Sequence, residues 1–364
     1  IENNAGSFLN FESDSKPDVT GGGKLKVSDS KAENDFPPPG WVYGDLFIWR
    51  GSTNTDWTDL SNWIATELPN ASSSVLIPSG LTKYPVLSGN VSVKGLTIKN
   101  GASISGGSYN ISISGDSELL GSISTTGNIY IKNPNASEIT VTVGANQTAG
   151  EMRVAGNVNL ELNEDITGIT QFWMAAATAD LTSNFKVEVS GSGSLSCTDF
   201  EINRASATNG VIGTLELGVP VTVSTEFKTH SGTALIIPAG KTVNVKGSFV
   251  HSANDSVPKS SVTVNGTLNV NSLAEGAAGT NTAFINLVAN NNASGTEMTV
   301  GANGKVVAGN FIVRNSYSNT GSTCPVINNG TIEITAGTGG IELPNYSGSG
   351  TVILNDGTKF TNNS

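Results

Sequence analysis

The chain has little charge, and this scarcity excludes several kinds of partner. Charged residues make up 13 % of its 364 residues, about half the usual share. Asp and Glu outnumber Lys and Arg by 30 to 19, so the formal net charge is −11. No basic patch is present that would release counterions from nucleic acid. We therefore expect neither a nucleic-acid partner nor binding to an anionic membrane surface.

Apolar runs and cysteines are also scarce. No stretch approaches the roughly 18 apolar residues that a membrane-spanning helix requires, so we expect no membrane span. Cys197 and Cys324 are too few for a disulfide framework. The fold inferred below separates them by about six coils, so we expect no bond between them. The chain begins with Ile1 and is polar and weakly charged, from which we expect an extracellular or cell-surface protein whose export signal has been removed.

Short alternating runs bounded by turn residues are abundant. From residue 88 onward, Val, Ile and Leu take every second position in phrases such as "SGNVSVKGLTIKN", "KTVNVKGSFVHS" and "SVTVNGTLNVNSL". Each phrase contains V-x-V-x-G and then a second short strand, most clearly at Gly247 and Gly266. This pattern indicates a repeat of about 20 residues with one strand-turn-strand coil per repeat. The Gly and Asn residues between strands fit corners where the chain needs a positive φ.

A unit of that size cannot bury its apolar face alone, whereas stacked coils share a continuous interior. We therefore predict an all-β fold, a right-handed parallel β-helix or solenoid of roughly 13 coils. A β-sandwich is the alternative. Two stretches alternate poorly, residues 164–181 and 272–295, and we expect them to be loops or short helices outside the stack.

The composition divides the chain into three segments. Residues 1–40 are polar, contain Gly21-Gly22-Gly23 and end in Pro37-Pro38-Pro39, as in an extended N-terminal arm. Residues 41–87 form a Trp-rich capping segment, and residues 88–364 form the parallel β-solenoid.

Three of the five tryptophans, Trp49, Trp57 and Trp63, lie within "WRGSTNTDWTDLSNW", just where the coils begin. The end of a solenoid exposes an unpaired strand, and large aromatic side chains can cover it. We interpret the three tryptophans as a hydrophobic cap. Exposed rings that stack on sugars are the alternative.

The residue order around this cluster, about residues 47–105, resembles the Trp-rich lead-in module of secreted parallel β-helix surface proteins of Bacteroidota and related bacteria. The resemblance implies a secreted parallel β-helix with an adhesive or surface role, and no particular reaction. The matching residues are Trp49, Gly51, Trp57, Asn62, Trp63, Pro69, Ile77, Pro78, Tyr84, Pro85, Leu87, Gly89, Leu96, Ile98 and Gly101.

Signatures of catalysis are weak. Polysaccharide-cleaving enzymes need paired carboxylates or carboxylates that hold Ca²⁺. The best pair is Asp199 and Glu201, which project from one strand face near Arg204, and Glu164-Asp165 is a second candidate. We interpret both pairs as solvated side chains and predict no enzymatic activity.

Metal and modification motifs are equally sparse. His230 and His251 lie about one coil apart, and without a third ligand they make a weak metal site. We expect both to be surface histidines, and we predict no metal and no cofactor. Asp255-Ser256-Val257 resembles the Asp-Ser/Thr-aliphatic O-glycosylation motif of Bacteroidota, so Ser256 is a candidate O-glycosylation site.

Three classes of function fit this chain to different degrees. A structural or self-assembling surface protein needs a regular rod, few charges and a means of joining copies, and the sequence meets these requirements best. A glycan-binding adhesin with exposed aromatic residues such as Trp173, Tyr317 and Tyr346 is the alternative. A polysaccharide lyase or hydrolase is the second alternative.

The N-terminal arm is the joining element that we predict. Two alternating stretches in it carry the apolar residues Phe8, Leu9, Phe11, Leu25 and Val27. Such a segment can add strands to the open sheet edge of a neighbour. Because donor and acceptor surfaces differ, this contact is head-to-tail and generates a filament unless it closes into a ring. We therefore expect other copies of the chain as the main partner, in a fibre or matrix, with glycans as possible partners.

Overall fold

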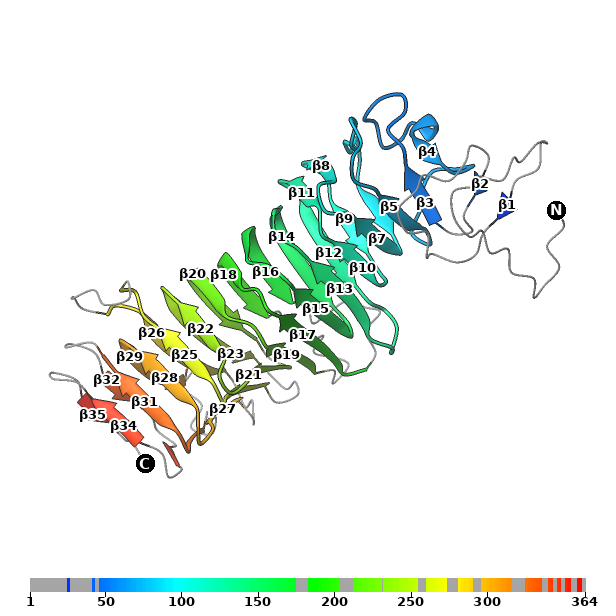
Figure 1. The fold of residues 1–364 in the computed structure, drawn as a ribbon. Coiled ribbons are helices and arrows are strands. Elements are labelled where there is room, and N and C mark those ends of the chain that lie inside the picture. Colours follow the sequence, from blue (N-terminus) through cyan, green and yellow to red (C-terminus); the bar gives the residue numbers. More distant parts are fainter. Residues whose placement is uncertain are drawn as a thin grey trace.

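The chain folds into an elongated stack of coils, with the first strands at one end and the last strands at the other (Figure 1). The structure is a computed structural model. It describes residues 25–26, 41–42, 46–174, 183–202, 212–230, 232–254, 260–273, 281–290, 296–315, 325–335, 340–342, 346–347, 351–354 and 359–361.

One wall of the stack is a 14-stranded sheet, here called the first sheet. All neighbouring strands in it are parallel except β3 and β4, which pair antiparallel at its N-terminal end. In spatial order the strands are β33 (Tyr346–Ser347), β30 (Val326–Asn328), β27 (Thr296–Val300), β24 (Ser260–Val264), β21 (Thr233–Ile237), β19 (Gly213–Leu217), β17 (Phe185–Gly191), β15 (Val158–Leu162), β13 (Ile139–Val143), β10 (Ser117–Leu119), β7 (Gly95–Ile98), β5 (Ser74–Ile77), β3 (Leu46–Trp49) and β4 (Trp63–Ile64).

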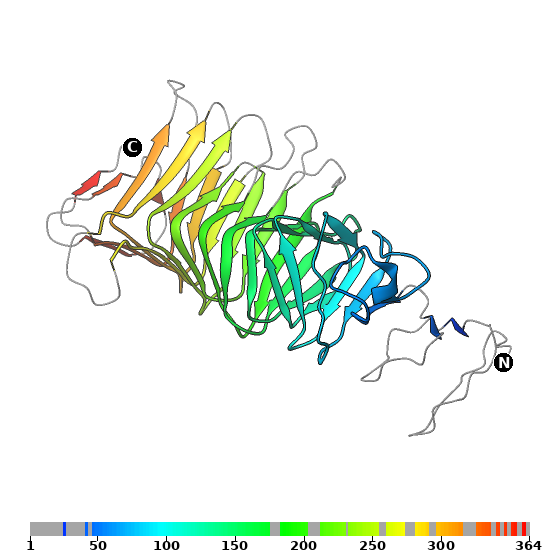
Figure 2. The same ribbon diagram turned by 90° about the horizontal axis from the view of Figure 1, so that it is seen from above.

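The rest of each coil belongs to a parallel sheet of 19 strands, the second sheet. Seen from above, successive coils lie side by side along the stack (Figure 2). The strands are β6 (Val91–Val93), β8 (Ser103–Gly107), β9 (Ile111–Ile113), β11 (Ser122–Thr125), β12 (Asn128–Lys132), β14 (Gln147–Ala155), β16 (Ile166–Met174), β18 (Leu195–Ile202), β20 (Val221–Thr229), β22 (Thr242–Val245), β23 (Ser248–Asn254), β25 (Thr267–Val270), β26 (Phe284–Asn290), β28 (Lys305–Ala308), β29 (Asn310–Asn315), β31 (Thr331–Ile334), β32 (Gly340–Glu342), β34 (Thr351–Leu354) and β35 (Lys359–Thr361).

Most coils contribute two short strands to the second sheet, but the middle coils join them into one long strand. Thus β20 pairs with β22 through its first half and with β23 through its second half. Outside both sheets, β1 (Leu25–Lys26) pairs with β2 (Trp41–Val42). Among the described residues the one helix is the three-residue 3₁₀ turn η1 (Leu60–Asn62), and no helix there is long and apolar enough to cross a membrane. The predicted all-β parallel β-helix is confirmed, and the β-sandwich is excluded because neighbouring strands are parallel.

Alternation along each strand creates the core. Residues of β13, β15 and β17 are buried and half-buried in turn. The buried positions align from coil to coil, so that Val158, Val187, Leu215 and Leu235 form a continuous row in which each residue is 0 % exposed. Each such side chain contributes about 1.5–3 kcal/mol on burial. The stack therefore supplies the interior that no single coil can build.

Four phenylalanines form a second continuous row inside the stack. Phe172, Phe200, Phe227 and Phe249 are aligned on successive coils and are 0 % exposed. Their ring centroids are 4.7, 4.4 and 5.3 Å apart along the row, within the range in which aromatic pairs attract beyond their burial. We call these residues the Phe row.

The length of the coils varies more than the sequence repeat predicts. Leu215 aligns with Leu235, the spacing of about 20 residues expected from the repeat. Val262 aligns with Met298, across a coil almost twice as long. Because several coils are long, the first sheet has 11 described strands after residue 88, fewer than the predicted roughly 13 coils.

Gly247 and Gly266, which the sequence aligns as equivalent, lie at different corners. Gly247 separates β22 from β23 within the second sheet, whereas Gly266 lies between β24 of the first sheet and β25 of the second. A Cβ at Gly247 would lie 2.0 Å from the carbonyl oxygen of Thr225, and one at Gly266 would lie 2.2 Å from that of Pro238. Close approach of another coil, and not a positive φ, therefore requires glycine at both positions.

The expectation that residues 164–181 and 272–295 leave the stack is wrong for the described parts that form β16 and β26. In β16 the buried residues are Ile166, Ile169, Phe172 and Met174, and the pairing with β18 shifts register between Ile166 and Ile169. This irregularity lets one strand continue around a corner, and the alternation by two is lost there. Residues 175–181, 274–280 and 291–295 lie outside the described residues.

Candidate functional site

The three clustered tryptophans are buried. Trp49, Trp57 and Trp63 are 0, 4 and 4 % exposed. The Trp63 ring centroid lies 5.0 Å from that of Trp49 and 4.7 Å from that of Trp57, in both cases edge to face. Trp49 Nε1 donates to the Lys83 carbonyl and Trp63 Nε1 to the Trp57 carbonyl, each at 2.8 Å. No ring is exposed as the sugar-stacking alternative requires. Protection of the sheet end by this cluster stays a prediction.

Asn62 organises the loop that carries these tryptophans. Its side chain is 0 % exposed. Its Oδ1 accepts the backbone N–H groups of Thr53 and Asn54 at 3.0 and 3.1 Å. Its Nδ2 donates to Asn54 Oδ1 at 2.7 Å and to the Asp56 carbonyl at 3.0 Å. One buried amide thus replaces the backbone partners that an irregular loop lacks.

We expect Asn62→Ala to lower the free energy of unfolding by about 2–3 kcal/mol, because it leaves polar groups of the loop without partners. Chemical denaturation of the variant measures this change. The exposed Asn100 offers a matched control, since Asn100→Ala should change the free energy by less than about 0.5 kcal/mol. Equal effects of the two substitutions would contradict the role assigned to Asn62.

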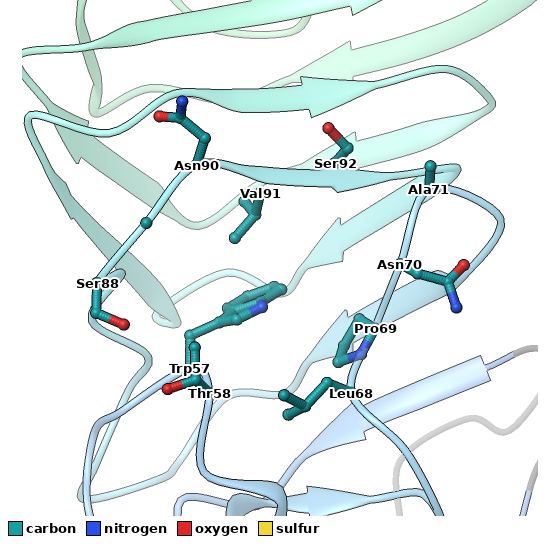
Figure 3. A pocket seen from close by; sticks show the side chains of 11 residues that line it. Trp57, Thr58, Leu68, Pro69, Asn70, Ala71, Ser88, Asn90, Val91 and Ser92 are labelled. Carbon is teal, nitrogen blue, oxygen red and sulfur yellow. The ribbon is translucent and has the colours of Figure 1, made fainter.

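A hollow of about 350 Å³ lies beside this cluster and the first coils (Figure 3). The Trp57 ring lies in the middle of the residues that surround it, with its nitrogen toward Leu68 and Pro69 (Figure 3). All of the lining residues are uncharged: Trp57, Thr58, Leu68, Pro69, Asn70, Ala71, Ser88, Gly89, Asn90, Val91 and Ser92.

A second group of side chains, mostly charged, lies outside the Phe row, on the outer side of β14, β16, β18 and β20. Strand pairing aligns Arg153, Trp173, Glu201 and Lys228 in one row. It aligns Glu151, Gln171, Asp199 and Glu226 in the next. We call these two rows, together with His230, the charged face.

Most charges of this face are paired. Arg153 Nε lies 2.5 Å from Glu151 Oε2, Lys228 Nζ lies 2.5 Å from Glu226 Oε2, and His230 Nε2 lies 2.9 Å from Glu201 Oε1. The hydrogen bond to Glu226 raises the pKa of Lys228. Burial lowers the pKa of His230, and Glu201 opposes that shift. The cations on this face are therefore held by carboxylates rather than presented to a ligand.

Trp173, a candidate for glycan binding, is half-buried on this face. The Arg153 guanidinium covers its ring at 3.9 Å from the centroid and lies 5.4 Å from the Tyr130 ring. Cation–π contact of this kind occupies one face of the ring, so a sugar could not stack on that face. Tyr317 lies outside the described residues, and for Tyr346 only the strand β33 is described.

The predicted carboxylate pairs differ in their surroundings. Asp199 and Glu201 are both half-buried and flank the buried Phe200, so they share the outer face as the spacing predicts. Among the described residues Asp199 has no hydrogen-bond or ion-pair partner. Glu164 accepts the Ala145 N–H at 3.1 Å and Asp165 accepts the Ser194 hydroxyl at 2.7 Å, so this second pair joins coils. Arg204 lies outside the described residues.

The two histidines lie on adjoining coils, but the expectation that both are at the surface is wrong for His251. Its partner in the sheet is Thr229, and it is 0 % exposed. The Thr229 hydroxyl contacts His251 Nδ1, and the Ser260 hydroxyl lies 3.4 Å from Nε2. Burial lowers the pKa of His251 to about 3. No group of three or more His, Cys, Asp or Glu able to hold a metal occurs within the described ranges.

Cys197 is a free thiol, 5 % exposed, and burial raises its pKa to about 12. It is therefore an unreactive core residue. Leu25 lies in β1, which pairs with β2 of the same chain. The other predicted arm residues Phe8, Leu9, Phe11 and Val27, as well as Ser256 and Cys324, lie outside the described residues.

Apart from Trp173, Asp199, Glu201 and His230, the residues of the charged face were not predicted from the sequence. The sequence nevertheless contains a pattern that indicates this face. The triplets "EMR" at 151, "QFW" at 171, "DFE" at 199 and "EFK" at 226 each place an apolar residue between two outward residues. Their spacing of roughly one coil predicts alignment on neighbouring strands. The charged face joins side chains from four neighbouring strands, whereas a pair of carboxylates such as Asp199 and Glu201 belongs to a single strand.

Comparison with known protein families finds a partial match. A family described as a domain of unknown function, DUF8693, matches residues 48–160. The match begins in β3, ends in β15 and includes every residue of the hollow. Neither a curated protein nor a solved structure matches this chain.

Proposed function

We propose that this protein is a non-enzymatic structural protein of the cell surface, a rod that assembles with copies of itself. The observation that supports this best is the uninterrupted stack. The first sheet keeps parallel pairing from β3 to β33, over a core of side chains that are mostly 0 % exposed. Such a quasi-one-dimensional stack is suited to span distance and to carry load.

The contacts that acidic and basic side chains make between coils also favour a structural role. Within the described ranges, contacts between acidic and basic side chains join neighbouring coils at four places. Each contributes at most about 1 kcal/mol, because these side chains are partly solvated. The acidic and basic groups thus serve packing between coils. These pairs are Lys99–Glu118 at 3.3 Å, Lys186–Glu216 at 2.7 Å, His230–Glu201 at 2.9 Å and Lys305–Glu333 at 2.9 Å.

Self-assembly through the arm is tested by deleting residues 1–36. We expect the full chain to form larger particles with rising concentration, as measured by light scattering. The deletion variant should stay monomeric and keep the circular dichroism of a β-rich fold, because its coils are intact. A triple variant, Phe8→Ser with Leu9→Ser and Phe11→Ser, should behave like the deletion. Unchanged self-association of both variants would contradict assembly by the arm.

Polysaccharide cleavage is a second candidate, favoured by the position of Asp199. This carboxylate aligns with Glu226 on the next coil. Neighbouring strands lie about 4.8 Å apart, close to the roughly 5–5.5 Å between the carboxyl groups of retaining glycosidases. Release of reducing ends from a polysaccharide panel, lost in both Asp199→Asn and Glu226→Gln, would replace the non-enzymatic proposal with this one.

A further inference from the structure

We propose that the hollow beside Trp57 is a binding site for one neutral sugar residue. The proposal goes beyond the structural role above and does not depend on it. It rests on three features of the hollow. The indole N–H of Trp57 has no hydrogen-bond partner among the described residues, the Trp57 ring is held in a fixed position, and no charged side chain lines the hollow.

The indole N–H of Trp57 lacks an acceptor. In the same cluster, Trp49 and Trp63 donate their N–H groups to carbonyl oxygens. Trp57 is 4 % exposed, yet its Nε1 has no hydrogen bond to any described residue. This nitrogen is not fully buried, so the N–H can be reached from the hollow that Trp57 lines. A ligand oxygen in the hollow would accept this N–H in place of water.

The ring that carries this donor is held in place. The Trp57 backbone N–H donates to the Val86 carbonyl at 3.2 Å, and its carbonyl accepts Trp63 Nε1 at 2.8 Å. The ring packs edge to face against Trp63 at 4.7 Å. The site is therefore formed before a ligand arrives, which lowers the entropic cost of binding.

The lining indicates the chemical class of the ligand. Leu68, Pro69 and Val91 offer apolar surface next to the indole, and Asn70, Asn90, Ser88 and Ser92 stand around it (Figure 3). A lining that combines apolar and neutral polar side chains suits a ligand that has both an apolar C–H face and several hydroxyl groups. Because no charged side chain lines the hollow, an anionic ligand would lose water without gaining a counter-charge. The volume of about 350 Å³ lies at the small end of ligand pockets, as one sugar residue requires.

Two hydroxyl groups of the surround are already engaged. Thr58 Oγ1 donates to Asp56 Oδ1 at 2.8 Å, and Ser88 Oγ lies 3.4 Å from the same oxygen. Asp56 itself does not line the hollow, and hydrogen bonds from Thr58 lower its pKa. Each hydroxyl keeps lone pairs that can accept from a sugar hydroxyl.

Gly89 allows the site to be filled without disturbing the fold. It lines the hollow, and a Cβ built there meets no atom within 4 Å. Gly89→Phe should therefore fold normally and occupy the space of the sugar. Ser79→Phe is the matched control, because it adds the same ring at an exposed position outside the lining.

Saturation-transfer NMR with the full chain tests the proposal, using the methyl glycosides of glucose, galactose, mannose and glucuronic acid as probes. At least one neutral glycoside should bind, and the glucuronide should bind at least about tenfold more weakly. Gly89→Phe should abolish binding, whereas Ser79→Phe should not change it. Trp57→Phe, which keeps a ring but removes the N–H, should weaken binding about five- to tenfold. Absence of binding by every neutral probe, or equal binding by the Gly89→Phe variant, would overturn the proposal.

Discussion

Replacing Phe200 with alanine is expected to lower the free energy of unfolding by about 3–5 kcal/mol. Phe200 lies within the Phe row, 4.7 Å from Phe172 and 4.4 Å from Phe227 between ring centroids, and is 0 % exposed. Its strand β18 is hydrogen-bonded to β16 on one side and to β20 on the other. The coils cannot move together to close the resulting cavity, so the cost should lie toward the upper end of the usual range.

Chemical denaturation, followed by far-UV circular dichroism, measures this effect. The control is Phe284→Ala, since Phe284 is 39 % exposed on the same sheet and should cost less than about 1 kcal/mol. The Phe200→Ala and Phe227→Ala substitutions should not be additive, because the two rings are in contact. A loss below about 1 kcal/mol in the Phe200→Ala variant would show that the row does not stabilise the stack.

Acidification is expected to destabilise the protein through His251. The pKa of this residue is about 3 in the folded chain against 6.5 for the free side chain, because burial penalises the imidazolium. Above about pH 6.5 the residue is neutral in both states and its contribution to stability is complete. As the pH falls from 6.5 toward 3, the unfolded chain takes up a proton that the folded chain does not. The free energy of unfolding then falls by about 1.4 kcal/mol per pH unit.

The test compares wild type with His251→Gln at pH 7 and pH 5. Glutamine keeps a donor and an acceptor for Thr229 and Ser260 but does not titrate. Between these two pH values wild type should lose about 2 kcal/mol more than the variant, as measured by urea denaturation. His230→Gln should change the pH dependence less, because His230 is only half-buried. Equal pH dependence of wild type and His251→Gln would disprove the assignment.

Local alternation predicted which face of many strands is buried. In β15, Val158, Leu160 and Leu162 point inward at every second position, and this period is a property of the extended chain itself. The same reasoning placed Asp199 and Glu201 on one outer face. It failed for β16, where a register shift at a corner interrupts the alternation.

Other features depended on which residues the coils bring together. The sequence placed His230 and His251 about one coil apart, but only the stacked structure shows that His251 points into the core beside Thr229 and Ser260. Likewise the Trp cluster is evident in the sequence. The hollow beside it needs Leu68 and Val91, which lie about one coil apart in the sequence, to line the same space.

The sequence by itself determined that this chain forms a parallel β-solenoid, because short alternating strands without helices can bury their apolar sides only by stacking. The tertiary structure alone decided the Phe row, the paired charges above it, the buried histidine and the hollow at Trp57. The physical reason is that these contacts join residues on different coils. The number of residues per coil varies, as shown by the aligned pairs Leu215 and Leu235 in one coil and Val262 and Met298 in another. No local sequence pattern specifies how many residues form a corner, and that number sets the register of the next strand.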